Sequence, residues 1–187
     1  MNRKQRTRLS KRLSYVLRHR PDSVGLELDA GGWVAVEELL AALGRGGRGV
    51  SRAELEEVVR TNEKQRFALS EDGLRIRASQ GHSVDVELGL EPVEPPELLY
   101  HGTVERFLDS IRREGIARGN RHHVHLSPDV ETAEKVGGRR GRPVILVVEA
   151  RRMHAAGLRF FVSANGVWLT EHVPAAYVRL PEGEGKS

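Results

Sequence analysis

Three short stretches of the sequence place arginine beside groups that can bind anions or exchange protons. They are Leu17-Arg18-His19, Lys64-Gln65-Arg66-Phe67 and Arg121-His122-His123-Val124-His125. Guanidinium forks bind phosphate and carboxylate groups with paired hydrogen bonds, and histidine has an ordinary pKa near neutrality. Each stretch also has a plainer interpretation. Arg18 and His19, taken alone, are typical of a last helical turn, where cations stabilise the helix dipole.

The third stretch raises the alternative of a metal site, because it holds three histidines in four positions. His123 and His125 fall on one face of a predicted strand, as two metal ligands would. No H-E-x-x-H motif, cysteine or nearby carboxylate completes the set. We therefore expect no metal.

A fourth candidate is the tripeptide His101-Gly102-Thr103, which follows a predicted strand. Its glycine permits close approach of another group to the backbone, and its two side chains can form hydrogen bonds. The chain has neither a G-x-G-x-x-G nor a G-x-x-x-x-G-K-[ST] motif, which excludes a Rossmann fingerprint and a P-loop. Nucleotide binding therefore needs support from elsewhere in the sequence.

The first half of the chain predicts three helices followed by a hairpin. Apolar residues recur at helical spacing from Leu9, and this helix should end near His19, before a proline. A second helix is predicted over Val36–Leu43, and Ser51 begins an S-x-x-E capping box for a third. The predicted hairpin strands are Arg66–Leu69 and Leu74–Ser79. This order is typical of a winged helix.

The second half predicts a β-rich lobe with two helices. Residues 89–97 contain three prolines and three glutamates, which predicts a linker between residues 1–88 and 98–187. The helices are predicted over Val104–Arg113, ending at Gly115, and from a Ser127-Pro128 cap to about Val136. A turn at Ala164-Asn165-Gly166 separates two of the predicted strands, which are Leu98–His101, His123–Leu126, Val144–Glu149, Phe160–Ser163, Val167–Thr170 and Ala176–Leu180.

Composition narrows the class of protein. The chain has 187 residues, no cysteine and 30 Lys and Arg against 26 Asp and Glu. Without cysteine, disulfides, thiolate metal sites and cysteine nucleophiles are excluded, and no apolar run approaches the length of a membrane span. We expect a cytoplasmic protein without a secretion signal. Basic residues crowd the first 20 positions and recur at 44–52 and 137–142, as contact with a phosphate backbone requires, although solvated surface charge explains any one cluster equally well.

Taken together, the motifs closely resemble those of the RNA 2′-phosphotransferases, often called tRNA 2′-phosphotransferases. Six segments match in order over about 160 residues. They are Leu9–His19, Asn62–Phe67, Ile76–Ser83, Leu99–Thr103, Arg121–Ser127 and Ser163–Val167. Two features depart from the family pattern: His122, where relatives often carry asparagine, and the Arg- and Gly-rich insert at 44–49.

The resemblance implies an α+β fold, with an N-terminal winged-helix lobe that binds RNA and a C-terminal lobe of the ADP-ribosyltransferase fold. It also implies a reaction: an internal RNA 2′-phosphate is transferred to NAD⁺ through an ADP-ribosylated RNA intermediate. The products are RNA with a 2′-OH, nicotinamide and ADP-ribose 1″,2″-cyclic phosphate. NAD⁺ would be a co-substrate, and we expect a monomer acting in tRNA processing and splicing.

The family's catalytic tetrad of three arginines and one histidine maps onto Arg18, His19, Arg66 and Arg121. We expect all four to act on the RNA phosphate, the first three from the N-terminal lobe and the last from the C-terminal lobe. The nucleophile is already an anion, so the first step needs positioning more than a general base.

The resemblance also implies a binding site for NAD⁺. It assigns to this site His101, Gly102, Thr103, His125, Ser127, Asn165 and Gly166. A plain hairpin turn explains the pair at 165 and 166 equally well. Gln80–Ser83 belongs to the family pattern but is equally explained by packing.

Two other functions stay open at this stage. A non-catalytic winged-helix protein that binds nucleic acid accounts for residues 1–83, but not for the His101 and Arg121 stretches. An ADP-ribosyltransferase acting on terminal phosphates of RNA or DNA, or on protein, would keep the NAD⁺ lobe and change the acceptor. A stable ADP-ribosylated product without cyclic phosphate would favour it.

Overall fold

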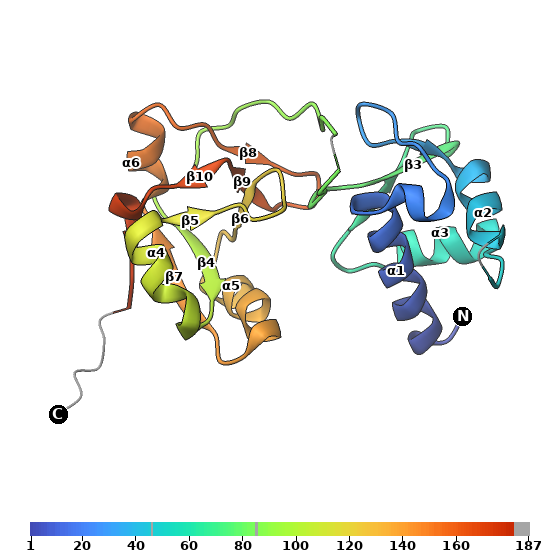
Figure 1. The fold of residues 1–187 in the computed structure, drawn as a ribbon. Helices are drawn as coiled ribbons and strands as arrows, with labels where there is room; N and C mark the ends of the chain where they lie inside the picture. Colours follow the sequence, from blue (N-terminus) through green and yellow to red (C-terminus); the bar gives the residue numbers. More distant parts are fainter. Residues whose placement is uncertain (46, 85, 182–187) are drawn as a thin grey trace. The chain divides into compact units, whose positions relative to one another are not determined.

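The computed structural model describes residues 1–45, 47–84 and 86–181, and these residues combine helices with short antiparallel strands (Figure 1). Two predictions fall partly outside this range: the insert at 44–49, which includes Gly46, and the C-terminal lobe at 98–187, which includes residues 182–187. The chain divides into two compact units, Met1–Leu90 (unit 1) and Glu91–Ser187 (unit 2). The fold is of the α+β class, and each unit is built around a hydrophobic core of its own.

The described residues of unit 1 form three α-helices and a small antiparallel sheet with strand order β1-β3-β2. The elements are α1 (Arg3–Arg18), β1 (Val34–Ala35), α2 (Val36–Arg45), α3 (Arg52–Arg60), β2 (Phe67–Leu69) and β3 (Arg75–Ala78), with a 3-10 turn at Pro21–Val24. The predicted hairpin is confirmed, because Phe67 pairs with Ala78 and Leu69 with Ile76. Strand β1 was not predicted, since two residues carry no alternating pattern.

Side-chain caps fix where the helices of unit 1 begin. The predicted capping box is confirmed: Ser51 accepts from the Glu54 backbone, and the Glu54 side chain accepts from the Ser51 backbone. Helix α1 has a second capping box, formed by Asn2 and Gln5, so it begins six residues before the apolar pattern that identified it. It ends at His19, as predicted. These helices bury Leu13, Leu17 and neighbouring apolar residues in the core of unit 1.

Up to residue 181, unit 2 forms two three-stranded antiparallel sheets and a two-stranded ribbon. The sheet order is β11-β7-β4 in one sheet and β6-β9-β8 in the other, and β10 pairs with β5. The strands are β4 (Leu99–Thr103), β5 (Ile116–Ala117), β6 (Val124–Leu126), β7 (Val144–Val148), β8 (Phe161–Val162), β9 (Trp168–Thr170), β10 (His172–Val173) and β11 (Val178–Arg179). An isolated bridge between Tyr100 and Ser127 joins β4 to the end of β6.

Three α-helices pack on these strands, and four sequence predictions need correction. The helices are α4 (Leu108–Glu114), α5 (Val130–Gly137) and α6 (Ala150–Ala155), with 3-10 turns at Glu105–Phe107, Gly138–Arg140 and Ala175–Tyr177. Two predicted helices were too few, because α6 is only six residues long and gave no clear period. The helix predicted from Val104 begins as a 3-10 turn, although it does end at Gly115. The strand predicted over Ala176–Leu180 is partly a 3-10 turn.

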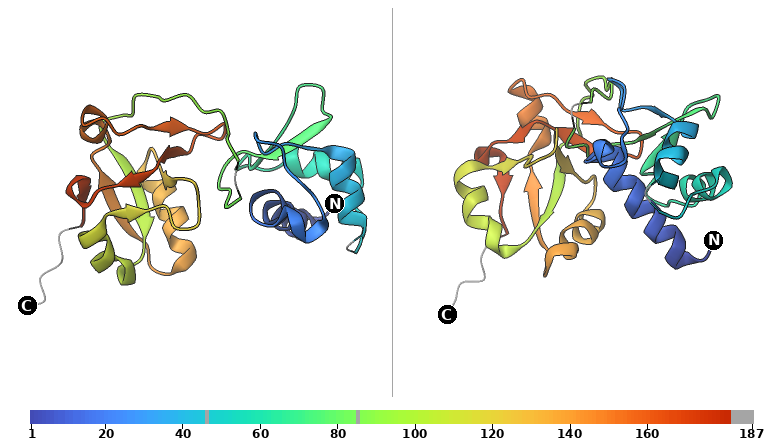
Figure 2. Two further views of the ribbon diagram at one scale, coloured as in Figure 1. Left: turned by 45° about the horizontal axis from the view of Figure 1, so that its top comes forward. Right: turned by 45° about the vertical axis from the view of Figure 1, so that its right-hand side comes forward.

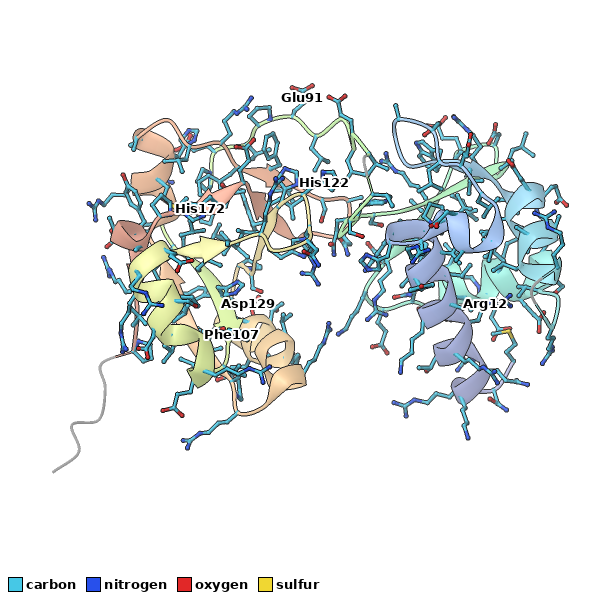
Figure 3. The ribbon with its side chains drawn as sticks, viewed as in Figure 1. Arg12, Glu91, Phe107, His122, Asp129 and His172 are labelled. Atoms are coloured by element: carbon cyan, nitrogen blue, oxygen red, sulfur yellow. The ribbon has the colours of Figure 1, made fainter. Side chains whose placement is uncertain are left out.

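The fourth correction concerns the start of α5, where the predicted Ser127-Pro128 cap is wrong. Asp129 is the N-cap, and its Oδ1 accepts from the Thr132 backbone at 2.7 Å. The backbone of Ser127 still pairs with that of Tyr100, through hydrogen bonds of 2.8 and 2.9 Å, so the helix begins only after this bridge. Asp129 is labelled at this position in Figure 3.

Helix α5 packs directly against strand β4, and glycine makes the contact possible (Figure 1). A Cβ atom at Gly102 would lie 1.9 Å from the Ala133 carbonyl oxygen and 2.8 Å from the Gly137 backbone nitrogen. No other residue fits there without moving the helix. Among the described residues, no helix has the length and apolar character needed to cross a membrane.

Candidate active site

The structure brings Arg18 and Arg66 together in unit 1, although 47 residues separate them. Arg18 is the last residue of α1, and Arg66 directly precedes β2. The Arg18 Nη2 donates to the Arg66 carbonyl oxygen at 3.5 Å, the long limit of a hydrogen bond. Both side chains are half-buried. The Arg18 guanidinium therefore contacts the backbone of the residue that carries the second guanidinium, and two such groups on neighbouring residues would suit an anion with several oxygens.

His19 joins this cluster and is held by Ser83. Its Nδ1 lies 2.9 Å from the Ser83 hydroxyl oxygen. The Ser83 backbone donates to the Arg18 carbonyl at 2.8 Å, and its hydroxyl lies 3.4 Å from the same carbonyl. When the hydroxyl donates to that carbonyl, it accepts the Nδ1 proton, which leaves the lone pair of the neutral imidazole on Nε2. Ser83 thus fixes both the ring and the helix end that carries it.

The backbone before Arg66 adopts a conformation that is unusual for its residue type. Gln65 has a φ of 40°, in the left-handed region. Its backbone donates to the Asn62 carbonyl at 2.8 Å, and its own carbonyl accepts from the Ser79 hydroxyl at 2.7 Å. The Ser79 backbone also donates to the Arg66 carbonyl at 2.9 Å. Such strain persists where surrounding contacts hold it, and it is concentrated at functional sites.

In unit 2 the candidate residues gather where β4 meets β6. The His101 Nδ1 lies 3.0 Å from the His125 carbonyl, and the Arg121 Nη1 lies 3.2 Å from the His125 Nδ1. Ser127, which is buried, bridges to Tyr100 of β4. Four predicted residues, His101, Arg121, His125 and Ser127, are therefore neighbours.

These contacts determine the tautomers of the two histidines. A guanidinium cannot accept a hydrogen bond, so the His125 Nδ1 must carry a lone pair, and its ring proton is on Nε2. A carbonyl cannot donate, so the His101 Nδ1 must carry a proton. These four residues of unit 2 therefore bring together a guanidinium, two imidazoles and one hydroxyl.

The remaining predicted residues of unit 2 lie beside a helix contact or in a turn. Gly102 is required by the contact with α5, and Thr103 beside it is buried. Asn165 and Gly166 form the predicted turn: Gly166 has a φ of 77°, and its backbone donates to the Ser163 carbonyl at 2.9 Å. The Ser163 hydroxyl also donates to the Asn165 Oδ1 at 2.6 Å. The turn is confirmed, and a ligand role for the pair stays a prediction.

His123 has different partners from His125. Its ring packs against Phe161, with centroids 5.6 Å apart. Partial burial lowers the pKa of His123, and the neighbouring charges of His122 and Arg118 lower it further. Within the part of the chain that the structure describes, no group of three or more His, Asp or Glu side chains is arranged to hold a metal ion.

Comparison with known proteins adds an independent observation. The family model described as "RNA 2′-phosphotransferase, Tpt1 / KptA family" matches residues 4–172. The chain belongs to the RNA 2′-phosphotransferase family. It is 58% identical to a probable RNA 2′-phosphotransferase of Burkholderia lata over 174 residues, covering 92% of this chain and 90% of the relative. It is 55% identical to those of Streptomyces coelicolor, covering 97% and 98%, and Pseudomonas syringae pv. tomato, covering 95% and 96%.

In this member of the RNA 2′-phosphotransferase family, two residues that sequence reasoning did not select support the predicted ones. Ser79 fixes the backbone that carries Arg66, and Ser83 contacts His19. Both serines belong to the motif segment Ile76–Ser83, and this resemblance is the sequence signal that could have identified them. The side-chain oxygen of Gln80, in the same segment, is buried with no hydrogen-bond partner among the described residues.

Proposed function

We propose that this chain transfers an internal 2′-phosphate from RNA to NAD⁺, leaving a 2′-hydroxyl on the RNA. The observation that carries the proposal is the cluster of Arg18, His19 and Arg66 in unit 1. Membership of the RNA 2′-phosphotransferase family supports removal of an RNA 2′-phosphate as the reaction. The chain is thus proposed to be an enzyme that uses NAD⁺ as a co-substrate.

The residues of unit 1 suit the phosphate. A phosphate dianion is already nucleophilic, so the enzyme does not need a base to activate it. It needs groups that orient the phosphate and stabilise the charge on its oxygens. The forks of Arg18 and Arg66 would supply both, since they bind phosphate oxygens in a fixed geometry. His19, oriented by Ser83, would exchange a proton with the phosphate through Nε2. We assign Arg121 of unit 2 to the phosphate as well.

The residues of unit 2 fit NAD⁺ by the chemistry of their donors. The His101 Nδ1 proton is used by a backbone carbonyl, and that of His125 lies on Nε2, so these hydrogen bonds fix the tautomer of each imidazole ring. Such groups suit ribose hydroxyls and phosphate oxygens. NAD⁺ itself would supply a ribose carbon whose leaving group, nicotinamide, departs as a neutral molecule. Gly102 is assigned to NAD⁺ through its backbone, since the space that a side chain on its α-carbon would need is filled by α5.

The architecture assigned to the two units is part of this proposal. For unit 1, three helices and the sheet order β1-β3-β2, with β2 and β3 as a hairpin, support a winged helix. For unit 2, two small antiparallel sheets with helices packed on them support an ADP-ribosyltransferase-like lobe. The absence of cysteine supports a cytoplasmic location, and we propose a monomer that acts in tRNA processing and splicing.

One experiment tests the reaction. The protein would be incubated with NAD⁺ and a short RNA carrying an internal 2′-phosphate, and both products would be followed by mass. We expect RNA lighter by one phosphate, free nicotinamide and ADP-ribose 1″,2″-cyclic phosphate. Stable ADP-ribosylated RNA as the final product would instead identify an ADP-ribosyltransferase. Binding without any change in mass would identify a non-catalytic nucleic-acid-binding protein.

A further inference from the structure

Helix α1 is unusual in its charge. Its 16 residues include seven cations and no acidic residue, and its first turn contains Arg3 and Lys4. Helices α2 and α3 instead carry glutamates in their first turns, where acids stabilise the helix dipole. Cations at the start of a helix, and like charges four residues apart, oppose helix formation. The fold of unit 1 therefore does not explain the charge of α1.

Some of these cations have internal partners. Arg6 pairs with Glu57 at 3.1 Å, and Arg12, labelled in Figure 3, donates to the Leu43 and Arg48 carbonyls at 2.8 and 3.3 Å. Apart from Arg18, which belongs to the active-site cluster, the remaining cations of α1 are Arg3, Lys4, Arg8 and Lys11. All four are exposed, and none forms an ion pair with a carboxylate of the described residues.

Three of the four lie in a line that leads to Arg18. With 3.6 residues per turn, Lys4, Arg8, Lys11, Tyr15 and Arg18 stay within an arc of about 80° on α1, and the buried Leu13 lies opposite. At 1.5 Å per residue, Lys4 is about 21 Å and Lys11 about 10 Å from Arg18 along the helix axis. Figure 2 shows α1, in blue, along its length. We call Lys4, Arg8, Lys11 and Tyr15 the α1 stripe.

Tyr15 contributes the aromatic member of the stripe. It is 51% exposed and is the only aromatic residue among the large apolar side chains that are exposed in the described chain. It lies one helical turn before Arg18. An exposed ring beside a row of cations is the arrangement by which proteins hold single-stranded nucleic acid, with bases stacked on the ring and phosphates on the cations.

We propose that the α1 stripe binds the RNA strand next to the 2′-phosphate, with backbone phosphates along Lys11, Arg8 and Lys4 and an unpaired base on Tyr15. This inference rests on the proposed function, because Arg18 is there assigned to the reacting phosphate. The stripe would extend recognition several nucleotides to one side of that phosphate. It would read the backbone and not the sequence, since its cations contact phosphates and its ring stacks on the face of any base.

The test measures binding of RNA strands by the full chain, using fluorescence anisotropy at several salt concentrations. The RNA is a labelled single strand of about a dozen nucleotides without a 2′-phosphate, so the readout does not depend on catalysis. The triple variant Lys4→Gln, Arg8→Gln, Lys11→Gln should bind about ten-fold more weakly. Its salt dependence should be shallower by about 2 in the log–log slope, since each phosphate contact on a single strand contributes about 0.7.

A second triple variant controls for net charge. Arg60, Arg113 and Arg159 match the stripe cations in number, are exposed, and form no ion pair with a described carboxylate. Their replacement by glutamine should leave Kd and slope close to wild type. Tyr15→Leu should weaken binding several-fold without changing the slope, while Tyr15→Phe should bind as wild type does. Thermal unfolding of the stripe variant should occur at the wild-type temperature or above it, because helix repulsion is relieved.

Two outcomes would overturn the inference. Equal losses in the stripe and control variants would show a general charge effect, and wild-type binding by the stripe variant would show that the strand lies elsewhere. If Tyr15→Leu binds as tightly as Tyr15→Phe, the stacking contact is wrong. Failure of the proposed function is a separate result: the wild-type protein would then bind RNA through the stripe but release no phosphate from a 2′-phosphorylated strand.

Discussion

Arg66 offers a clean test at the scale of single residues, because its backbone and side chain have separable roles. Its carbonyl accepts from both Arg18 and Ser79, and these hydrogen bonds survive truncation of the side chain. Arg66→Ala should therefore keep the local fold and remove one phosphate-binding fork. We expect phosphate removal to fall by at least about 100-fold, the usual effect of losing a group that stabilises transition-state charge.

The affinity for NAD⁺ of the same variant distinguishes between assignments. The residues proposed to bind NAD⁺ belong to unit 2, so Arg66→Ala should bind NAD⁺ within a few-fold of wild type in calorimetry. A loss of NAD⁺ affinity as large as the loss of activity would show that the assignment is wrong. Arg66→Lys serves as the companion variant, since it keeps the charge without the planar fork.

Ser83 is expected to act through His19 and not on the substrate. Ser83→Ala removes the hydroxyl that lies 2.9 Å from the His19 Nδ1, so the ring loses its fixed orientation. Turnover should fall about ten-fold, which is less than the roughly 100-fold or more that positioned proton transfer contributes, because His19 itself remains; KM for RNA should change little. The pH–rate profile should move as well, because the hydroxyl sets the tautomer.

Ser83→Thr is the matched control, since it retains a hydroxyl and should restore most of the turnover. A purely structural role for Ser83 predicts a different pattern. The alanine variant would then show reduced thermal stability, an unchanged pH profile and no selective effect on kcat.

At the scale of elements, the contact between β4 and α5 depends on Gly102. The atoms that a new side chain would meet are backbone atoms of α5, which cannot rotate away. Gly102→Ala should lower the free energy of unfolding by about 1–3 kcal/mol or more, as overpacking does. Gly138→Ala is the control: Gly138 has a φ of −60° and has nothing within 4 Å of its added Cβ, so alanine should be neutral or slightly stabilising. Chemical denaturation of both variants, compared with wild type, measures the two changes in the free energy of unfolding.

Elements with a strong local signal were predicted well from the sequence. Helix α3 follows from one capping box, and the β2–β3 hairpin from two alternating runs around a turn. Elements whose position depends on contacts with distant residues were not predicted well. Strands β1, β5 and β10 are two residues long, and the start of α5 depends on a bridge between Ser127 and Tyr100 that no local pattern encodes.

The candidate site shows the same division. Motif resemblance selected Arg18, His19, Arg66 and Arg121, and the structure places the first three together. It could not select Ser79, because the role of that residue depends on a hydrogen bond to a carbonyl 14 residues earlier. The resemblance also could not reveal that Gly102 is needed for packing. In sequence, a glycine required by a helix contact cannot be distinguished from one required by a ligand.

At the scale of the whole molecule, His123 predicts how stability depends on pH. Burial lowers its pKa in the folded state, so below about pH 6.5 the unfolded chain binds a proton more readily. Stability is therefore complete above the ordinary histidine pKa and is lost as pH falls toward the lowered value. Carboxylates with lowered pKa, such as Glu57 and Glu149, lose their contributions only at more acidic pH. Thermal unfolding of His123→Phe should vary less between about pH 7 and 5 than that of wild type.

The two cores allow a last prediction about how the molecule unfolds. Every buried residue of one core lies between Leu9 and Ala78, and every one of the other between Leu99 and Val173. Each unit also contains one of the chain's two tryptophans, Trp33 and Trp168. A substitution that strains one core should therefore destabilise that unit first, because separate cores support separate cooperative transitions.

Gly102→Ala provides the strain, and single-tryptophan backgrounds provide the readout. In Trp33→Phe protein the fluorescence reports unit 2 through Trp168, and Gly102→Ala should move its denaturation midpoint to lower denaturant. In Trp168→Phe protein the signal comes from Trp33, and the same substitution should leave the midpoint of unit 1 within experimental error. If both tryptophans report the same shift, the two units unfold in a single cooperative transition, and the prediction of separate transitions is wrong.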